Sequence, residues 1–230
     1  MNISNIGEIQ EICKRFNIEV PKVFIETGTF IGQTAFEMSN HFDKIYSIEI
    51  QEKLYEDVVN IKNKKGIDNV NFLLGDSGEK IIDIIKEVEE PSVFFLDAHY
   101  AGTAVWDSTG KEAIESGSWI HKTWTKDWEY RDWNKEGKEV VVTGRGEKDV
   151  PMMEELIAIG EYFNHGGIII CDDLNHWGKD LYHGDWSDIS IEKVLGCLKN
   201  TPVLGHYVTK ADVNNPKTPH RLIINIDKKN

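Results

Sequence analysis

Short, nearly continuous apolar runs alternate along the chain with segments in which apolar residues recur at helical spacing. The runs have the length and composition of strands buried on both faces, and they lie at 22–26, 44–49, 69–74, 92–97 and 166–172. The segments with helical spacing lie at 32–40, 51–64, 78–89 and 150–163. This alternation predicts an α/β fold, with a mostly parallel sheet, helices on both of its faces and right-handed crossovers.

The two ends of the chain extend this pattern. Residues 1–20 predict an N-terminal amphipathic helix, whose apolar positions are Ile6, Ile9, Ile12, Cys13 and Phe16. After the fifth strand, 186–200 predicts a helix, and 204–210 and 221–227 predict two closing strands that pair antiparallel at the sheet edge. The pattern therefore predicts seven strands.

Segment 101–149, after the fourth strand, breaks the pattern. It is rich in glycine and charge, and it contains five of the 7 tryptophans, namely Trp106, Trp119, Trp124, Trp128 and Trp133. A connection of this length is typical of an inserted functional segment. The rings fit a lid over a bound substrate or a homo-oligomer interface equally well, and the sequence leaves both open.

Composition narrows the range of functions. A chain of 230 residues with 40% hydrophobic content fits a single domain, 1–230. A formal net charge of -13 argues against nucleic acid as a partner, because such binding depends on lysine and arginine. The 3 cysteines form no C-x-x-C pair, and no apolar stretch reaches the roughly 20 residues of a membrane span. We therefore expect a reduced, cytoplasmic protein without a membrane span.

Acidic residues stand at or just past the end of every one of the five strands of the alternating pattern. They are Glu26, Glu49, Asp76, Asp97 and the pair Asp172–Asp173. Each acid alone is better explained as the N-cap of the following helix. Together they favour a ligand site, because ligands of such sheets bind outside the carboxyl ends of the strands.

The loop after the first strand, Glu26-Thr27-Gly28-Thr29-Phe30-Ile31-Gly32, is the most informative motif. It lacks the middle glycine of G-x-G-x-x-G, and no G-K-[ST] follows it, so neither a dinucleotide nor a P-loop nucleotide is favoured. The carboxylate of Glu26 would also repel a pyrophosphate. A ligand that carries a positive charge or hydroxyl donors fits this loop better.

The motif and the order of the acids resemble the class I S-adenosylmethionine-dependent methyltransferases. The resemblance implies a Rossmann-like seven-stranded sheet and a cofactor without phosphate, with Glu49 on the ribose hydroxyls and Asp76 facing the adenine amino group. The cofactor-binding residues that it implies are Glu26, Thr27, Gly28, Thr29, Gly32, Thr34, Glu49, Asp76, Ser77 and Asp97. Phe30 departs from the family pattern, which often has another glycine at that position.

The stretches FFLDAHYAG and GGIIICDDLNH resemble, in particular, the magnesium-dependent sugar O-methyltransferases of the macrocin and mycinamicin type. The resemblance makes Asp97, Asp172 and Asp173 ligands of Mg²⁺, which prefers oxygen donors. Three clustered carboxylates without a cation would repel one another. Without a metal, Asp173 would instead cap a helix and Asp172 would face the substrate.

His99, two residues beyond Asp97, is the candidate general base, because imidazole titrates near neutral pH. Alternatively it orients Asp97, and His176 is the second candidate for the base. Tyr100, His176 and Trp177 fall on the substrate side of the resemblance.

The sequence thus predicts an O-methyltransferase (EC class 2.1.1) that acts on a sugar, a nucleotide-linked sugar or a glycan intermediate. A small-molecule N-methyltransferase would need no metal or base. A metal-dependent hydrolase would leave Glu26, Glu49 and Asp76 without a role, and a cofactor-binding module without catalysis would not need His99.

Overall fold

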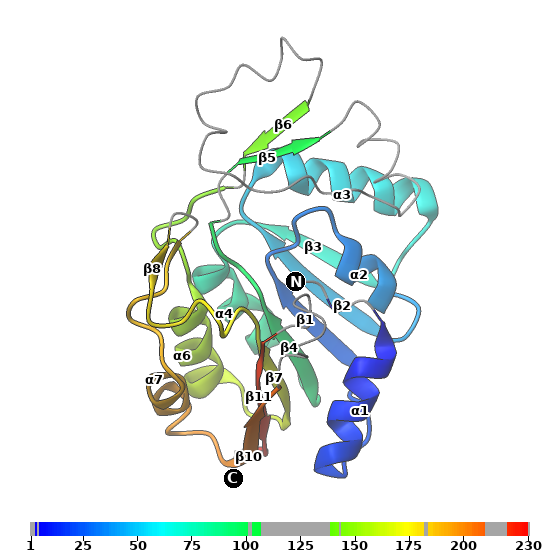
Figure 1. The fold of residues 1–230 in the computed structure, drawn as a ribbon. Helices are drawn as coiled ribbons and strands as arrows, with labels where there is room; N and C mark the ends of the chain where they lie inside the picture. Colours follow the sequence, from blue (N-terminus) through cyan, green and yellow to red (C-terminus); the bar gives the residue numbers. More distant parts are fainter. Residues whose placement is uncertain are drawn as a thin grey trace, which may run out of the picture.

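The computed structural model describes residues 3, 5–100, 103–106, 139–142, 144–181, 184–209 and 220–229, and its centre is a 7-stranded sheet in the order β10-β11-β7-β4-β1-β2-β3 (Figure 1). The strands are β1 Val23–Thr27, β2 Lys44–Glu49, β3 Val70–Leu74, β4 Ser92–Leu96, β7 Gly167–Cys171, β10 Val203–Val208 and β11 Leu222–Ile226. Each predicted strand is confirmed to within two residues at either end. The continuous apolar runs are buried throughout in β1, β4, β7 and β11.

The sheet is mostly parallel. β1 pairs in parallel with β2 and β4, β2 with β3, and β4 with β7, whereas β11 runs antiparallel to both β7 and β10. The closing antiparallel pair is therefore confirmed, with the last strand lying inside and β10 at the edge. The order of the strands reverses between β1 and β4, and the crevice at the carboxyl ends of these two strands is the expected ligand position in such a sheet.

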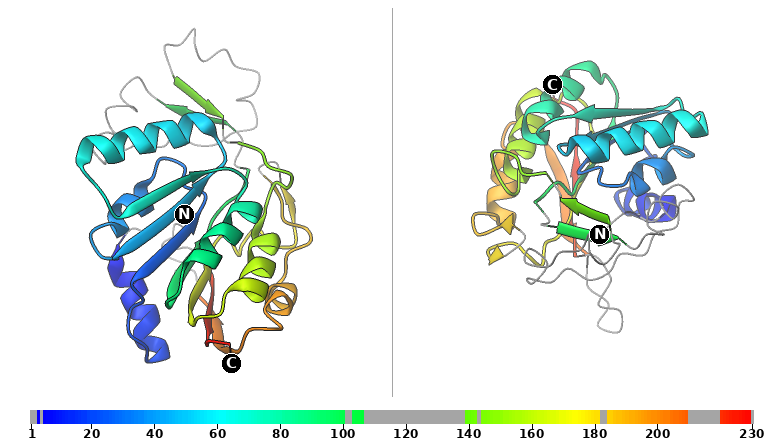
Figure 2. Two further views of the ribbon diagram at one scale, coloured as in Figure 1. Left: turned by 180° about the vertical axis from the view of Figure 1, so that it is seen from behind. Right: turned by 90° about the horizontal axis from the view of Figure 1, so that it is seen from above.

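Helices cover both faces of this sheet (Figure 2). Their bounds are α1 Ile6–Phe16, α2 Gln33–Met38, α3 Glu52–Lys65, α4 Ser77–Glu87, α6 Met152–Tyr162 and α7 Ile191–Cys197. One apolar core joins α1 and α2 to one face, and a second joins α4, α6 and α7 to the other. The predicted N-terminal helix thus packs on the sheet, where Ile9, Ile12 and Cys13 are buried.

The helix predicted at 186–200 is shorter in the structure, where α7 spans Ile191–Cys197. It begins only at Ile191, where the Ser190 side chain accepts a hydrogen bond from the Lys193 amide at 3.3 Å and so caps it. Ahead of it, β8 Asp180–Leu181 pairs with β9 Gly184–Asp185, a small hairpin that the apolar pattern did not reveal. Trp186, just after β9, is buried in the core and not on a helix.

Two short strands belong to the predicted insert, β5 Thr103–Trp106 and β6 Glu139–Val142, and they pair antiparallel. The tryptophans at 119, 124, 128 and 133 lie outside the described residues. Both alternatives for the insert, a lid and an interface, therefore stay predictions. Among the helices that the structure describes, none has both the length and the apolar character that a membrane crossing requires.

Candidate active site at the carboxyl edge of the sheet

The loop after β1 turns sharply through three residues with positive φ, namely Gly28 at 83°, Phe30 at 51° and Gly32 at 75°. A Cβ on Gly28 would lie 2.8 Å from the Asp97 carbonyl oxygen, so only glycine lets this loop pass the backbone after β4. Gly28 thus lets the loop after β1 pass close to the backbone that follows β4. Phe30 adopts the left-handed conformation without being glycine.

Glu26 lies beneath this loop and is 2% exposed. Its Oε2 accepts a hydrogen bond from Ser47 Oγ at 2.6 Å, and Thr29 Oγ1 lies 2.6 Å from the same hydroxyl. Burial raises the pKa of Glu26 to about 8, with the charges of Asp97 and Glu49 acting in the same direction and the hydrogen bonds of Ser47 and Thr34 opposing it. Burial therefore favours the neutral form of this carboxyl, and a cation beside it would favour the anion.

Ser47 was missed by sequence reasoning. It faces Glu26 directly in the parallel register of β1 and β2, and it is fully buried. A polar residue in the middle of the apolar run KIYSIE was the available signal. Its meaning depended on which strand lies alongside.

Glu49, at the end of β2, holds the glycine loop from the other side. Its Oε2 accepts from the Phe30 amide at 2.7 Å and its Oε1 from the Gln51 amide at 2.8 Å. Burial raises the pKa of Glu49 to about 7, against the effect of the backbone hydrogen bonds. The predicted ribose acceptor therefore lies beside the loop as expected, and it also fixes the conformation of Phe30.

Asp76 and Ser77 open α4. Asp76 Oδ1 accepts from the Gly78 amide at 2.9 Å, so Asp76 is an N-cap, which was the alternative reading of this acid. Ser77 Oγ donates to Glu155 Oε1 at 2.5 Å. Glu155, on α6, is fully buried, and burial raises its pKa to about 8. No sequence signal marked Glu155, because it occupies an apolar position of its helix.

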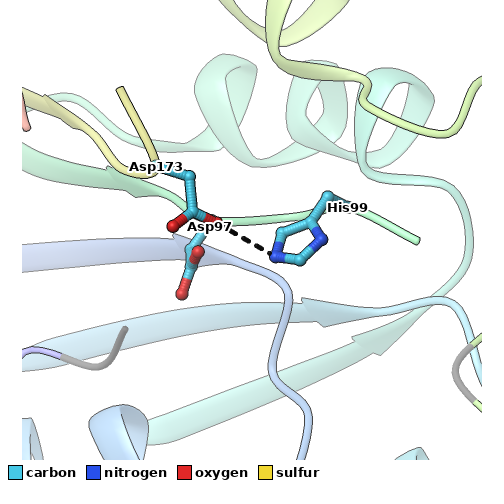
Figure 3. A group of neighbouring side chains, drawn as sticks. All are labelled: Asp97, His99 and Asp173. Carbon is cyan, nitrogen blue, oxygen red and sulfur yellow. Dashed lines mark ion pairs between the residues drawn. The ribbon is translucent and has the colours of Figure 1, made fainter. Parts of the chain in front are cut away.

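Asp97, His99 and Asp173 converge where β4 and β7 end (Figure 3). One ligand atom from each lies within 4.8 Å of the others, which makes them a group among the described residues that could hold a metal ion. His99 Nε2 lies 3.2 Å from Asp173 Oδ2, and His99 Nδ1 lies 3.3 Å from the Tyr100 carbonyl oxygen. Both ring nitrogens therefore face oxygen acceptors, an arrangement that suits the protonated ring.

The charges of this group shift its titration. Burial would lower the pKa of His99, but the hydrogen bond with Asp173 and the charges of both aspartates raise it above its ordinary value. Burial would raise the pKa of Asp173, yet the hydrogen bond from His99 holds it below its ordinary value. Burial raises the pKa of Asp97 to about 7, and the neighbouring charges of Asp172 and Asp173 add to this shift.

Asp172 turns away from this group. Its Oδ2 accepts from Arg221 Nη2 at 3.1 Å, and Arg221 also pairs with Glu8 of α1. Asp172 Oδ1 accepts from the amide of Asp173, whose φ of 55° points the adjacent carboxylate towards His99. The structure thus brings Asp97 and Asp173 together as predicted, while Asp172 sits in a buried ion pair with a residue that sequence reasoning did not single out.

The predicted substrate-side residues lie around the same edge. His176 Nδ1 is 3.9 Å from Asp173 Oδ2, and its ring meets Trp186 at 5.6 Å between centroids. Trp177 packs against the core below it. The Tyr100 ring faces the guanidinium of Arg145, whose central carbon lies 4.6 Å from the ring centroid.

Comparisons with known proteins agree with this architecture. A candidate rRNA methylase from Clostridium thermocellum matches at 14% identity and a TM-score of 0.51, covering 98% of this chain and 100% of the other. The N-methyltransferase NodS from Bradyrhizobium japonicum WM9 matches at 8% identity and a TM-score of 0.50, covering 97% and 94%. The chain has the Rossmann-like methyltransferase fold. No family model and no curated protein matches the sequence.

Proposed function

We propose that this protein is an S-adenosylmethionine-dependent O-methyltransferase that acts on a hydroxyl of a sugar, a nucleotide-linked sugar or a glycan intermediate. One observation carries the proposal. The glycine loop proposed to bind the cofactor and the His99–Asp173 pair lie at one edge of the sheet, where Gly28 lies close to the Asp97 backbone. A methyl donor and a proton acceptor can therefore meet in the crevice between β1 and β4.

The cofactor would be held by the loop and its acids. Glu49 offers both carboxylate oxygens to the ribose hydroxyls, and Glu26 offers a counter-charge to the ammonium of the methionine part. Thr29 and Thr34 are buried near Glu26, Thr27 is buried beside Glu155, and Ser77 opens α4 beside Asp76. Alignment of the acceptor oxygen, the methyl carbon and the sulfur would contribute much of the rate.

His99 would act as the general base. In the neutral ring, Asp173 would hold the Nε2–H, which would leave Nδ1 to take the proton. The acceptor hydroxyl would attack the methyl carbon as the bond from that carbon to sulfur breaks, the hydroxyl proton would pass to Nδ1 of His99, and S-adenosylhomocysteine would be the product. Once Nδ1 has taken the proton, it could donate to the Tyr100 carbonyl oxygen, which lies 3.3 Å away.

Mg²⁺ fits the oxygen donors of Asp97 and Asp173, which lie within the 4.8 Å group. Asp172 was the third predicted ligand, but its Oδ2 accepts a hydrogen bond from Arg221. Asp172 would instead hold Asp173 in place, because its Oδ1 accepts a hydrogen bond from the Asp173 amide. When bound, the ion would lower the pKa of the acceptor hydroxyl. His99 would then serve as base and not as a third ligand.

The chemical class of the methyl acceptor distinguishes this proposal from RNA methylation and from N-methyl transfer to an amine. One structural neighbour is named as a candidate rRNA methylase, but a net charge of -13 offers little attraction for RNA phosphates. An amine acceptor needs no metal, so sensitivity to chelation would distinguish N-methyl transfer from O-methyl transfer. A cytoplasmic location and a homo-oligomer stay predictions.

The proposal is tested by calorimetry with S-adenosylhomocysteine. Wild-type protein should bind it, and Glu49→Ala should weaken binding by about 1.5–3 kcal/mol, the range for hydrogen bonds to a charged group. Glu52→Ala, an exposed position in the first turn of α3, is the matched control and should bind normally. No binding by correctly folded wild-type protein would reject the proposal. Transfer of labelled methyl groups to a panel of free and nucleotide-linked sugars would then identify the acceptor.

A further inference from the structure

A short strap, defined as residues 144–149, leads from β6 towards α6 and crosses the carboxyl edge of the sheet. At its start, a Cβ on Gly144 would lie 2.5 Å from Ile50 Cγ2, so the backbone presses on the residue directly after Glu49. At its middle, a Cβ on Gly146 would lie 2.2 Å from Asp76 Oδ2 and 3.1 Å from Ile50 Cδ1. The strap therefore lies against both Ile50 and Asp76.

A hydrogen bond fixes the strap to Asp76. The Glu147 amide donates to Asp76 Oδ2 at 3.2 Å, while Asp76 Oδ1 accepts from the Gly78 amide. Each oxygen of this carboxylate thus accepts from a backbone amide, and the Gly146 backbone fills the space beside Oδ2. The strap therefore already supplies Oδ2 with one donor and lies in contact with it.

The far end of the strap is anchored beyond β4. The Tyr100 amide donates to the Asp149 carbonyl oxygen at 2.6 Å. Arg145 makes two hydrogen bonds with the Asp149 carboxylate, of 2.5 and 2.8 Å, and lies over the Tyr100 ring. The strap is consequently tied down on both sides of the crevice, from the ends of β2 and β3 to the segment after β4.

We propose that the strap lies in the adenine subsite, so that the strap and the cofactor compete for Asp76. This inference rests on the proposed function, in which Asp76 receives the adenine amino group. In the structure, the Glu147 amide supplies the donor that adenine would supply, and Gly144 and Gly146 cover the surface of Ile50 beside it. Binding of the cofactor then requires the strap to leave, which makes the strap a self-inhibitory contact.

Two variants weaken the strap contact without changing Asp76. Gly146→Ala places a methyl group where only 2.2 Å is available, and Glu147→Pro removes the amide donor. Because a hydrogen bond of this kind contributes about 1 kcal/mol net, each variant should raise the affinity for S-adenosylhomocysteine about three- to tenfold, mainly through faster association. Gly196→Ala on α7, where a Cβ would meet nothing within 4 Å, is the control and should leave binding unchanged.

Hydrogen exchange gives a second readout on the wild-type protein. Adding S-adenosylhomocysteine should speed exchange in the peptide that covers 144–149 while slowing it at the ends of β1 and β2. Slower exchange in that peptide, or weaker binding by both variants, would overturn the inference, because the strap would then hold the cofactor in place. Unchanged binding by both variants would also overturn it, because the strap would then not contact the cofactor site. If neither wild type nor variants bind the ligand, the proposed function fails, and this inference fails with it.

Discussion

The buried ion pair between Arg221 and Asp172 gives the strongest prediction about stability. The antiparallel register that sets Leu222 opposite Cys171 places Arg221 beside Asp172, and the two residues are 0% and 1% exposed. The guanidinium also pairs with Glu8 and lies over the Phe95 ring, its central carbon 5.2 Å from the ring centroid. Arg221→Met keeps much of the volume of this side chain and removes its charge.

The expected cost follows from the charge that stays behind. Without Arg221, the Asp172 carboxylate is buried without its cation, and removing one partner of a buried pair costs about 3–5 kcal/mol. The double variant Arg221→Met with Asp172→Asn removes both charges and should recover most of that loss. Glu8→Gln should cost only about 1 kcal/mol, because the Glu8 side chain is 29% exposed.

Urea denaturation followed by circular dichroism measures these differences in the free energy of unfolding. A loss below about 1 kcal/mol in Arg221→Met would refute the reasoning, and so would a double variant no more stable than the single one. Either result would mean that the stability of the fold does not depend on the pairing of Asp172 with Arg221. It would favour Asp172 as a metal ligand together with Asp97 and Asp173.

Three further predictions concern titration and catalysis. Because burial raises the pKa of Glu26 to about 8 from 4.5, the native state keeps a proton that the unfolded chain has lost. The free energy of unfolding should therefore fall as pH rises from 4.5 to about 8, and Glu26→Gln should flatten this slope in urea denaturation at several pH values. His99→Ala should lower turnover by about 10²–10⁴-fold with cofactor affinity preserved. The wild-type rate should rise with pH and level off above the ordinary range of histidine, because its neighbours raise the pKa of His99; an unchanged pH profile in the variant would assign the base elsewhere. EDTA should abolish turnover and leave S-adenosylhomocysteine affinity nearly unchanged, and full activity in EDTA would exclude a role for Mg²⁺.

The sequence by itself determined the elements and the edge at which the site lies. Apolar runs of strand length, each followed by helical spacing, leave little choice but a parallel sheet, and a parallel sheet brings its carboxyl ends together. The acids Glu26, Glu49 and Asp97 therefore had to meet at one edge. These conclusions depend on local patterns, which the order of residues specifies directly.

Only the tertiary structure decided which groups pair within that edge. Asp172 and Asp173 are neighbours in sequence, but a φ of 55° at Asp173 sends one carboxylate to Arg221 and the other to His99. Arg221 lies far along the chain from Asp172, and the two residues meet only because β11 inserts next to β7. Glu155 lies far along the chain from Ser77, and these two meet only because α6 packs on α4. Such contacts depend on packing between distant segments, and periodicity within one segment carries no information about its neighbour.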